Sequence, residues 1–254
     1  MSRFKNITEI DREKLIRPAA PVRDSADPEE TAHPEFLHPP MLAGEALETL
    51  IGIRDAIWKL SRERPLRLIG ITSSGEMEGK TRMAVGLSLT FAMDTRKRVL
   101  LVDANLRAPA VASLFRLPSS PGLSDLILED LPLNDVLLTA GHYPLSILVA
   151  GKSHLTPAEI YSFPRFAQRM AEIRESFDMT IVDTSGVKRH PDVEIFGKHL
   201  DGVVLVMEAD NTQLSLMQAT KTRIEAAGVP ILGVVMNRVK NPIPHFINRR
   251  FGLD

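Results

Sequence analysis

The stretch LIGITSSGEMEGKTRMAVGLSLTFAM, residues 68–93, decides the fold. Its first residues form an apolar run that is typical of a buried strand, and apolar residues of its second half recur at helical spacing. Between these halves lies a turn that ends in Gly79-Lys80-Thr81. This order predicts a phosphate-binding P-loop, because backbone N–H groups and the dipole at a helix N-terminus both favour an anion.

In such a loop we expect Lys80 to contact the β- and γ-phosphates and the Thr81 hydroxyl to ligate Mg²⁺. The strict motif has Gly or Ala six residues before the lysine, where this chain has Ser74. A strand–turn–helix with an incidental lysine is therefore the alternative. The residues predicted to surround the nucleotide are Ser74, Gly75, Glu76, Met77, Glu78, Gly79, Lys80, Thr81 and Arg82.

Composition limits the possible functions. With 254 residues and 44% hydrophobic residues, the chain can form one large α/β domain plus a tail. The net charge of −1 provides no basic field for a nucleic-acid partner, and the absence of cysteine excludes disulfides and thiol chemistry. No apolar run approaches the roughly 20 residues that span a bilayer, and the N-terminus lacks a secretory signal. We therefore expect a cytoplasmic protein.

Three segments differ in character. Residues 1–40 carry six prolines and many charges, which predicts a disordered N-terminal arm, either passive or used for docking. Residues 41–240 form the P-loop domain. Residues 241–254 combine apolar side chains with Arg249 and Arg250, so they form a candidate short amphipathic helix. This tail would pack on its own domain, contact a membrane partner, or contact a membrane surface peripherally.

Strands alternate with helices along the domain, which predicts an α/β fold with a mostly parallel sheet and helices on both faces. A helix is expected over 43–60, and one loop with a short helix over 121–138. A capping box at Thr156 begins a helix that continues to Phe177, with Phe163 on its core face. The remaining strands are expected at 98–103, 145–150, 177–183, 201–208 and 229–238.

Two of these apolar strands end in a carboxylate, Asp103 and Asp183. In an open parallel sheet the ligand crevice lies at the carboxyl ends of the strands, so both side chains are expected near a phosphate-bound Mg²⁺. The segment before Asp183 has the form of a Walker B motif. For Asp103 the alternative is a turn or helix N-cap residue, which is common after a strand.

With these pieces assembled, residues 43–240 resemble the bacterial tyrosine kinases (BY-kinases) of capsule and exopolysaccharide synthesis. These belong to the deviant-Walker P-loop class, which also contains the MinD and ParA ATPases. The resemblance is carried by ITSSGEMEGKT (71–81, Walker A), RVLLVDANLRAP (98–109, Walker A′) and FDMTIVDTSG (177–186, Walker B). It implies ATP or ADP with Mg²⁺ as cofactors and Lys80 and Asp103 as catalytic residues. It also implies Thr81, Asp103 and Asp183 as metal ligands, with Asn237 and Arg238 near the adenine.

The chain departs from the family pattern at the site. Glu76-Met77 replace the usual Pro-Gly of the P-loop turn, so Glu76 adds an anion that needs Mg²⁺ or a base to offset it. Asn105 replaces the second Walker A′ carboxylate, and an amide cannot act as a base. Ser185-Gly186 replace Pro-Pro after Walker B.

Other departures concern assembly and phosphorylation. The family's E-x-x-R-x-x-R helix of ring assembly appears as Glu45, Glu48 and Ile51 without either arginine, which leaves self-association open. The tail has no tyrosine, and the chain contains only Tyr143 and Tyr161. Autophosphorylation of a tail cluster is therefore not expected.

The resemblance implies a cytosolic ATP-binding component of exopolysaccharide or capsule biosynthesis and export. It would work with a separate membrane co-polymerase, a chain-length determinant, to regulate chain length. Either it is an active protein-tyrosine kinase and ATPase, or it is a degenerate nucleotide-sensing regulator with weakened or lost activity. The alternative is a MinD-like ATPase that cycles on a membrane, although Gly75 stands where that subfamily has its signature lysine.

Overall fold

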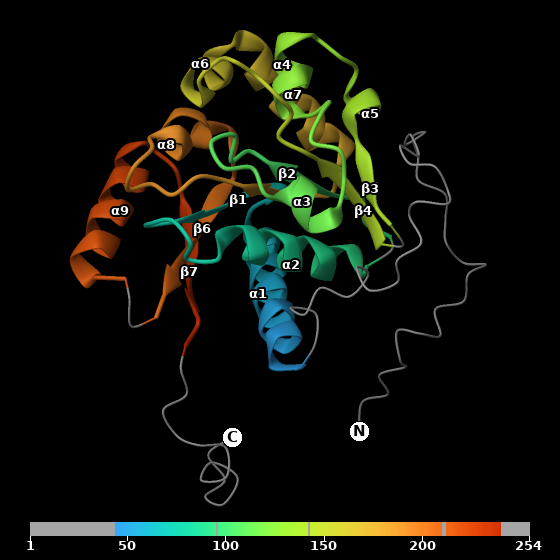
Figure 1. Cartoon of the computed structure of the whole chain (residues 1–254). Coiled ribbons are helices and arrows are strands. Elements are labelled where there is room, and N and C mark those ends of the chain that lie inside the picture. Colours follow the sequence, from blue (N-terminus) through green and yellow to red (C-terminus); the bar gives the residue numbers. More distant parts are fainter. Residues whose placement is uncertain (1–43, 95, 142, 210–211, 240–254) are drawn as a thin grey trace, which may run out of the picture.

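The computed structural model describes residues 44–94, 96–141, 143–209 and 212–239. Within them, a seven-stranded sheet lies between two layers of helices (Figure 1). The strand order is β3-β4-β2-β5-β1-β6-β7, and every neighbouring pair is parallel except β3 and β4. The predicted fold class, an α/β P-loop domain with a mostly parallel sheet and helices on both faces, is therefore confirmed. The predicted arm and tail lie outside the described residues.

The strands are β1 Leu68–Ser73, β2 Val99–Asp103, β3 Leu138–Ala140, β4 Tyr143–Leu148, β5 Met179–Asp183, β6 Gly202–Glu208 and β7 Ile231–Asn237. The helices are α1 Gly44–Glu63, α2 Lys80–Ala92, α3 Val111–Phe115, α4 Leu123–Leu128, α5 Leu133–Val136, α6 Pro157–Ser162, α7 Pro164–Ser176, α8 Asp192–Phe196 and α9 Leu214–Ala226, with a 3₁₀ turn, η5, at Gly197–His199. None of the helices in the described ranges is both long and apolar enough to cross a membrane.

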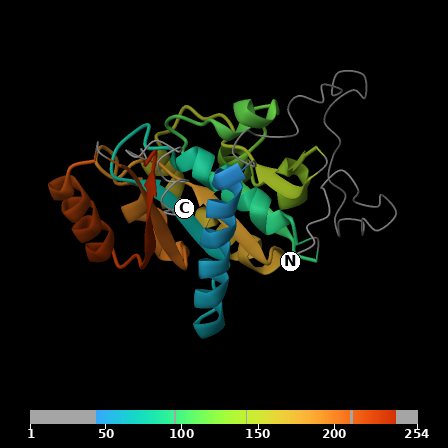
Figure 2. The same cartoon turned by 90° about the horizontal axis from the view of Figure 1, so that it is seen from below.

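The central strands β1, β2 and β5 are buried along their whole length, which explains their nearly continuous apolar sequences. On one face they pack against α1 and α2, through residues such as Ile57, Leu87 and Phe91. On the other face they pack against α4 to α9, through residues such as Phe166 and Phe196. Figure 2 shows α1 crossing the first face, and α9 beside the β7 edge.

Two expectations about the helical layer were wrong. The segment 121–138 contains two short helices, α4 and α5, and then begins the antiparallel edge strand β3, which is too short to produce a periodic signal. The helix predicted from Thr156 to Phe177 is two helices, α6 and α7, that meet at Phe163. The residue before a proline avoids helical backbone, and Phe163 is extended (ψ 134°) before Pro164 and 38% exposed rather than in the core.

Candidate functional site

The loop between β1 and α2 depends on a glycine next to its lysine. Gly79 has φ 95°, and a Cβ there would lie 2.1 Å from Nδ2 of Asn237. This left-handed, crowded position accepts only glycine. Asn237 itself donates from Nδ2 to the Glu78 carbonyl oxygen at 2.8 Å. The end of β7 therefore supports the P-loop, and the proximity of Asn237 to an adenine stays a prediction.

The middle of the loop carries the departures from the family pattern. Met77 adopts φ 62°, which costs a non-glycine residue about 1–2 kcal/mol, and its side chain is 78% exposed. Glu78 is buried, and its carboxylate accepts from the Gly75 N–H at 2.9 Å and from the Thr212 hydroxyl at 2.5 Å. The Glu78 side chain therefore links two parts of the loop to each other, and it also links the loop to Thr212.

Glu76 has basic neighbours that the sequence order does not reveal. Its carboxylate lies 3.5 Å from the Arg189 guanidinium and 4.0 Å from Nε2 of His190. The Arg189 pair is largely exposed to solvent, so it contributes at most about 1 kcal/mol, whereas the His190 side chain is 28% exposed. Arg189 and His190 nevertheless place basic side chains beside Glu76. A phosphate site next to this carboxylate requires such groups to compensate its negative charge.

Asp183 is the most unusual carboxylate of the site. It is completely buried, and neither of its oxygens has a hydrogen-bond partner among the described residues. Burial and the neighbouring Asp103 carboxylate raise its pKa to about 8, while Thr81 and Lys80 act in the opposite direction. An unpartnered buried carboxylate is costly, and a divalent cation would satisfy it.

The donor set fits Mg²⁺ only together with a nucleotide. The described residues contain no cluster of three or more His, Cys, Asp or Glu side chains that could hold a metal alone. Mg²⁺ usually takes one or two carboxylates plus water and substrate phosphates. The Asp183 carboxylate at the end of β5 and the Thr81 hydroxyl at the start of α2 could hold Mg²⁺ in this way.

Asp103 lies beside Asp183, because the two residues are register partners at the ends of β2 and β5. Burial raises the pKa of Asp103 to about 6. Its oxygens accept from the backbone N–H groups of Asn105 (3.2 Å), Ala110 (3.0 Å) and Val111 (3.0 Å). The interpretation of Asp103 as a residue that supports the turn before α3 is therefore confirmed, and its role at a phosphate-bound Mg²⁺ stays a prediction.

Asn105, which departs from the family pattern, and the remaining predicted site residues have different surroundings. Asn105 is buried, and its Nδ2 donates to the Ala108 carbonyl oxygen at 3.1 Å. Arg238 has φ 56° and pairs with Glu208 at 2.8 Å beyond the end of β7. Arg82 is exposed on the first turn of α2. The buried Ser74 hydroxyl has no partner among the described residues.

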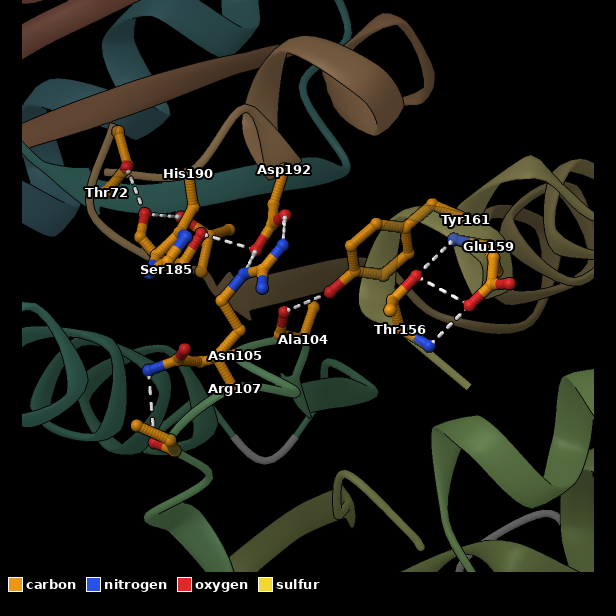
Figure 3. A network of polar contacts seen from close by, with 12 residues as sticks. Thr72, Ala104, Asn105, Arg107, Thr156, Glu159, Tyr161, Ser185, His190 and Asp192 are labelled. Atoms are coloured by element: carbon orange, nitrogen blue, oxygen red, sulfur yellow. Dashed lines mark hydrogen bonds and ion pairs between the residues drawn. The ribbon is translucent and has the colours of Figure 1, made fainter. Parts of the chain in front are cut away.

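A polar network next to Asp103 was not predicted (Figure 3). Arg107 forms two hydrogen bonds of 2.9 Å with the completely buried Asp192 carboxylate. Asp192 also accepts from the Ser185 hydroxyl at 2.8 Å. Arg107 belongs to the segment 98–109 that resembles Walker A′, but nothing in the sequence pairs it with an aspartate 85 positions away.

A glycine-bearing loop at a helix N-terminus, two carboxylates at neighbouring strand ends and this sheet define the fold of the P-loop NTPase class. No protein-family model matches the chain. It is 31% identical over 188 residues to the tyrosine-protein kinase YwqD of Bacillus subtilis, covering 74% of this chain and 79% of the relative. It is 27% identical over 192 residues to the putative tyrosine-protein kinase CapB of Staphylococcus aureus, covering 76% and 84%. The chain belongs to the bacterial tyrosine kinase family.

Solved structures agree with this assignment. The crystal structure of the chimerical protein CapA2B2 matches with a TM-score of 0.75 and 27% identity, over 82% of this chain and 91% of that one. The septum site-determining protein MinD of Pyrococcus horikoshii, complexed with Mg-ADP, matches with a TM-score of 0.58 and 19% identity, over 72% and 76%. At that identity the MinD structure shows a shared fold only.

Proposed function

We propose that this chain is a Mg²⁺- and ATP-binding component of exopolysaccharide or capsule biosynthesis and export. It works at the cytoplasmic side of the membrane with a separate membrane co-polymerase that sets chain length. The proposal rests on one observation: the unpartnered, buried Asp183 carboxylate lies where Lys80 and Thr81 begin α2. Membership of the bacterial tyrosine kinase family supports the assignment to polysaccharide synthesis.

The residues of the site have separable roles in this proposal. Lys80 neutralises the phosphates, and Mg²⁺ held by Thr81 and Asp183 supplies further positive charge to them. Asp103 orients the acceptor hydroxyl or takes its proton. Its pKa of about 6 suits this role, because the carboxylate is then ionised at neutral pH but is still a usable base.

We propose that nucleotide binding is retained and that phosphoryl transfer is weaker than in relatives with a carboxylate at position 105. Asn105 supports this, because its amide is engaged with the Ala108 carbonyl and cannot accept a proton. The acceptor tyrosine belongs to another polypeptide. Tyr161 is buried and donates its hydroxyl to the Ala104 carbonyl at 2.7 Å, so it is not accessible to a phosphate.

Calorimetric titration with ATP and ADP, with and without Mg²⁺, tests the proposal when phosphate release and phosphotyrosine transfer are followed on the same sample. Binding with slow turnover is the expected result. Binding with no turnover would make the chain a nucleotide-dependent regulator. Absence of binding would overturn the proposed function and leave a scaffold.

Lys80→Ala is expected to abolish nucleotide binding, because the lysine supplies the positive charge at the phosphates. The matched control is Lys59→Ala, which removes an exposed lysine of α1 away from the site and should bind as wild type does. If Lys80→Ala binds ATP as tightly as wild type, the P-loop assignment is wrong.

The polysaccharide context has its own test. A gene neighbourhood of glycosyltransferases would support it, and a neighbourhood of division or partition genes would contradict it. Association with a membrane co-polymerase is measured by co-purification of the two full-length chains.

A further inference from the structure

The loop that follows β2 surrounds Asp103. Both ends of this loop donate backbone N–H groups to the Asp103 carboxylate, from Asn105 on one side and from Ala110 and Val111 on the other. The position of the carboxylate therefore depends on the conformation of residues 104–110. Any contact that fixes this loop also fixes Asp103.

Arg107, in the middle of the loop, forms an ion pair with another element. Its guanidinium binds both oxygens of Asp192, at the start of α8, through two hydrogen bonds of 2.9 Å. An arginine fork on a carboxylate fixes orientation as well as distance. Asp192 is completely buried, and the Arg107 guanidinium provides the positive charge that pairs with its carboxylate.

Asp192 is in turn tied to the strand end that carries Asp183. The Ser185 hydroxyl, two residues after Asp183, donates to Asp192 at 2.8 Å. The Ser185 carbonyl accepts from the Thr72 hydroxyl of β1 at 2.9 Å. Residues from four segments are thereby joined in one chain of contacts, Thr72–Ser185–Asp192–Arg107, in which Ser185 takes part through both its carbonyl and its hydroxyl (Figure 3).

One contact of this network depends on a residue that departs from the family pattern. Where the resemblance leads us to expect Pro-Pro after Walker B, Ser185 provides a hydroxyl donor that a proline lacks. The loop after β5 and the loop after β2 are therefore linked through the same aspartate. Asp103 and Asp183, the two carboxylates of the proposed metal site, lie at the ends of β2 and β5, and these loops follow the same two strands.

We propose that Arg107 is a positioning residue. Through Asp192 and Ser185 it fixes the loop 104–110, and with it the Asp103 carboxylate relative to Asp183. Its effect on nucleotide binding rests on the proposed function, whereas its effect on the loop does not.

Amide hydrogen exchange of the nucleotide-free chain, followed by NMR, tests the effect on the loop. In Arg107→Met the amides of Asn105, Ala110 and Val111 are expected to exchange at least about tenfold faster, with the amides of β6 unchanged. The matched control is Arg165→Met, which removes a similarly half-buried arginine that pairs with Asp130 at 3.0 Å away from the site. Equal acceleration in β6, or no acceleration at the three amides, overturns the proposal.

Nucleotide titration then separates positioning from general destabilisation. We expect Arg107→Met to lower ATP affinity about 10- to 100-fold in Mg²⁺ and to leave affinity in EDTA unchanged, as is typical when a residue behind a metal ligand is lost. Arg107→Lys should recover part of the loss, since an ammonium cannot bind both oxygens as a fork. An equal loss with and without Mg²⁺ would show that the role is merely structural.

Ser185→Ala keeps the test decisive if Arg107→Met does not fold, because it removes a single hydrogen bond. It should accelerate exchange at the same three amides more weakly, and its effect should be non-additive with that of Arg107→Lys. Additive effects would contradict a shared network. If wild type binds no nucleotide, the proposed function fails, and the exchange experiment alone still decides the role of Arg107.

Discussion

At the scale of single residues, the titration of Asp183 has a predictable effect on stability. Its pKa in the folded chain, about 8, lies above the usual 3.8, so between these values the folded state keeps a proton that the unfolded chain releases. The contribution of this bound proton to the free energy of unfolding is complete at low pH and is lost as the pH rises towards 8.

Without divalent cations, Asp183→Asn should therefore be about 1–3 kcal/mol more stable than wild type at pH 8 and nearly equal to it at pH 4. Thermal unfolding in EDTA across this range measures the difference. A wild-type chain that becomes more stable relative to the variant between pH 5 and 8 would contradict the prediction.

Asn105→Asp restores the carboxylate of the family pattern. The change removes the hydrogen bond from Nδ2 to Ala108 and adds a third acidic group near Asp103 and Asp183. We expect the metal-free chain to lose about 1–3 kcal/mol of unfolding free energy at pH 8, and Mg²⁺-dependent ATP binding and phosphotyrosine transfer to increase.

Asn105→Ala is the control for this change, because it loses the hydrogen bond without adding charge. Calorimetry and a phosphotyrosine assay compare the three chains. Transfer that stays at the wild-type level in Asn105→Asp, despite tighter Mg²⁺ binding, would show that the amide is not what limits the reaction.

At the scale of elements, the P-loop lies directly against the segment that follows β5. The Val187 and Lys188 N–H groups donate to the Ser73 and Ser74 carbonyls, both at 2.9 Å. A Cβ on Gly186 would lie 2.5 Å from the Gly75 carbonyl oxygen, which is closer than real contacts allow. The glycine after Walker B and the unusual P-loop therefore fit one another.

Gly186→Ala is expected to push the P-loop away, at a cost of about 1–3 kcal/mol in unfolding free energy and with weaker nucleotide binding. Gly52→Ala is the matched control, because a Cβ in this part of α1 meets nothing within 4 Å. The control should gain about 0.5–1 kcal/mol, since alanine favours a helix over glycine. Chemical denaturation and calorimetry measure both effects, and an unaffected Gly186→Ala chain would show that the P-loop yields freely.

The elements that could be predicted from sequence are those with local signals. The P-loop, the capping box at Thr156 and the apolar strands that end in Asp103 and Asp183 each follow from residues adjacent in sequence. The three-residue β3 was missed because it is too short for periodicity, and the break at Phe163 was missed although Pro164 was a signal for it.

The contacts of the site could not be predicted in the same way. The pairs Arg107–Asp192, Glu78–Thr212 and Glu76–Arg189 join residues far apart in sequence, and their distances depend on how the strands and loops are placed in three dimensions. The contact partners of the candidate site residues were therefore not predictable from sequence.

At the scale of the whole molecule, the two ends of the sheet have different roles. The carboxyl ends of the strands carry the site, and Asp201 joins elements at the opposite end. Its carboxylate accepts from the Arg67 and Leu68 N–H groups at 2.6 and 2.8 Å and from the Arg174 guanidinium at 2.7 Å. This one side chain links the starts of β1 and β6 to α7.

Asp201→Ala should lower the unfolding free energy by about 2–3 kcal/mol, because two backbone N–H groups and a guanidinium lose their acceptor. Nucleotide affinity of the folded chain should not change. Glu225→Ala, which removes one exposed ion pair with Lys221 (3.8 Å), is the control and should cost less than about 0.5 kcal/mol. Denaturant unfolding and calorimetry on the same samples decide the point, and an altered affinity would show that the two ends are coupled.

The packing of α1 on α2 has an optical consequence. Trp58 is the single tryptophan of the chain, and its ring meets that of Phe91 edge-on with centroids 5.3 Å apart. Lys97 places its ammonium 5.8 Å from the same ring. Because α2 begins at Lys80, the intrinsic emission of this one indole reports on the helix that carries the P-loop lysine. Separation of α1 from α2 would therefore be visible as a fluorescence change in the unlabelled chain.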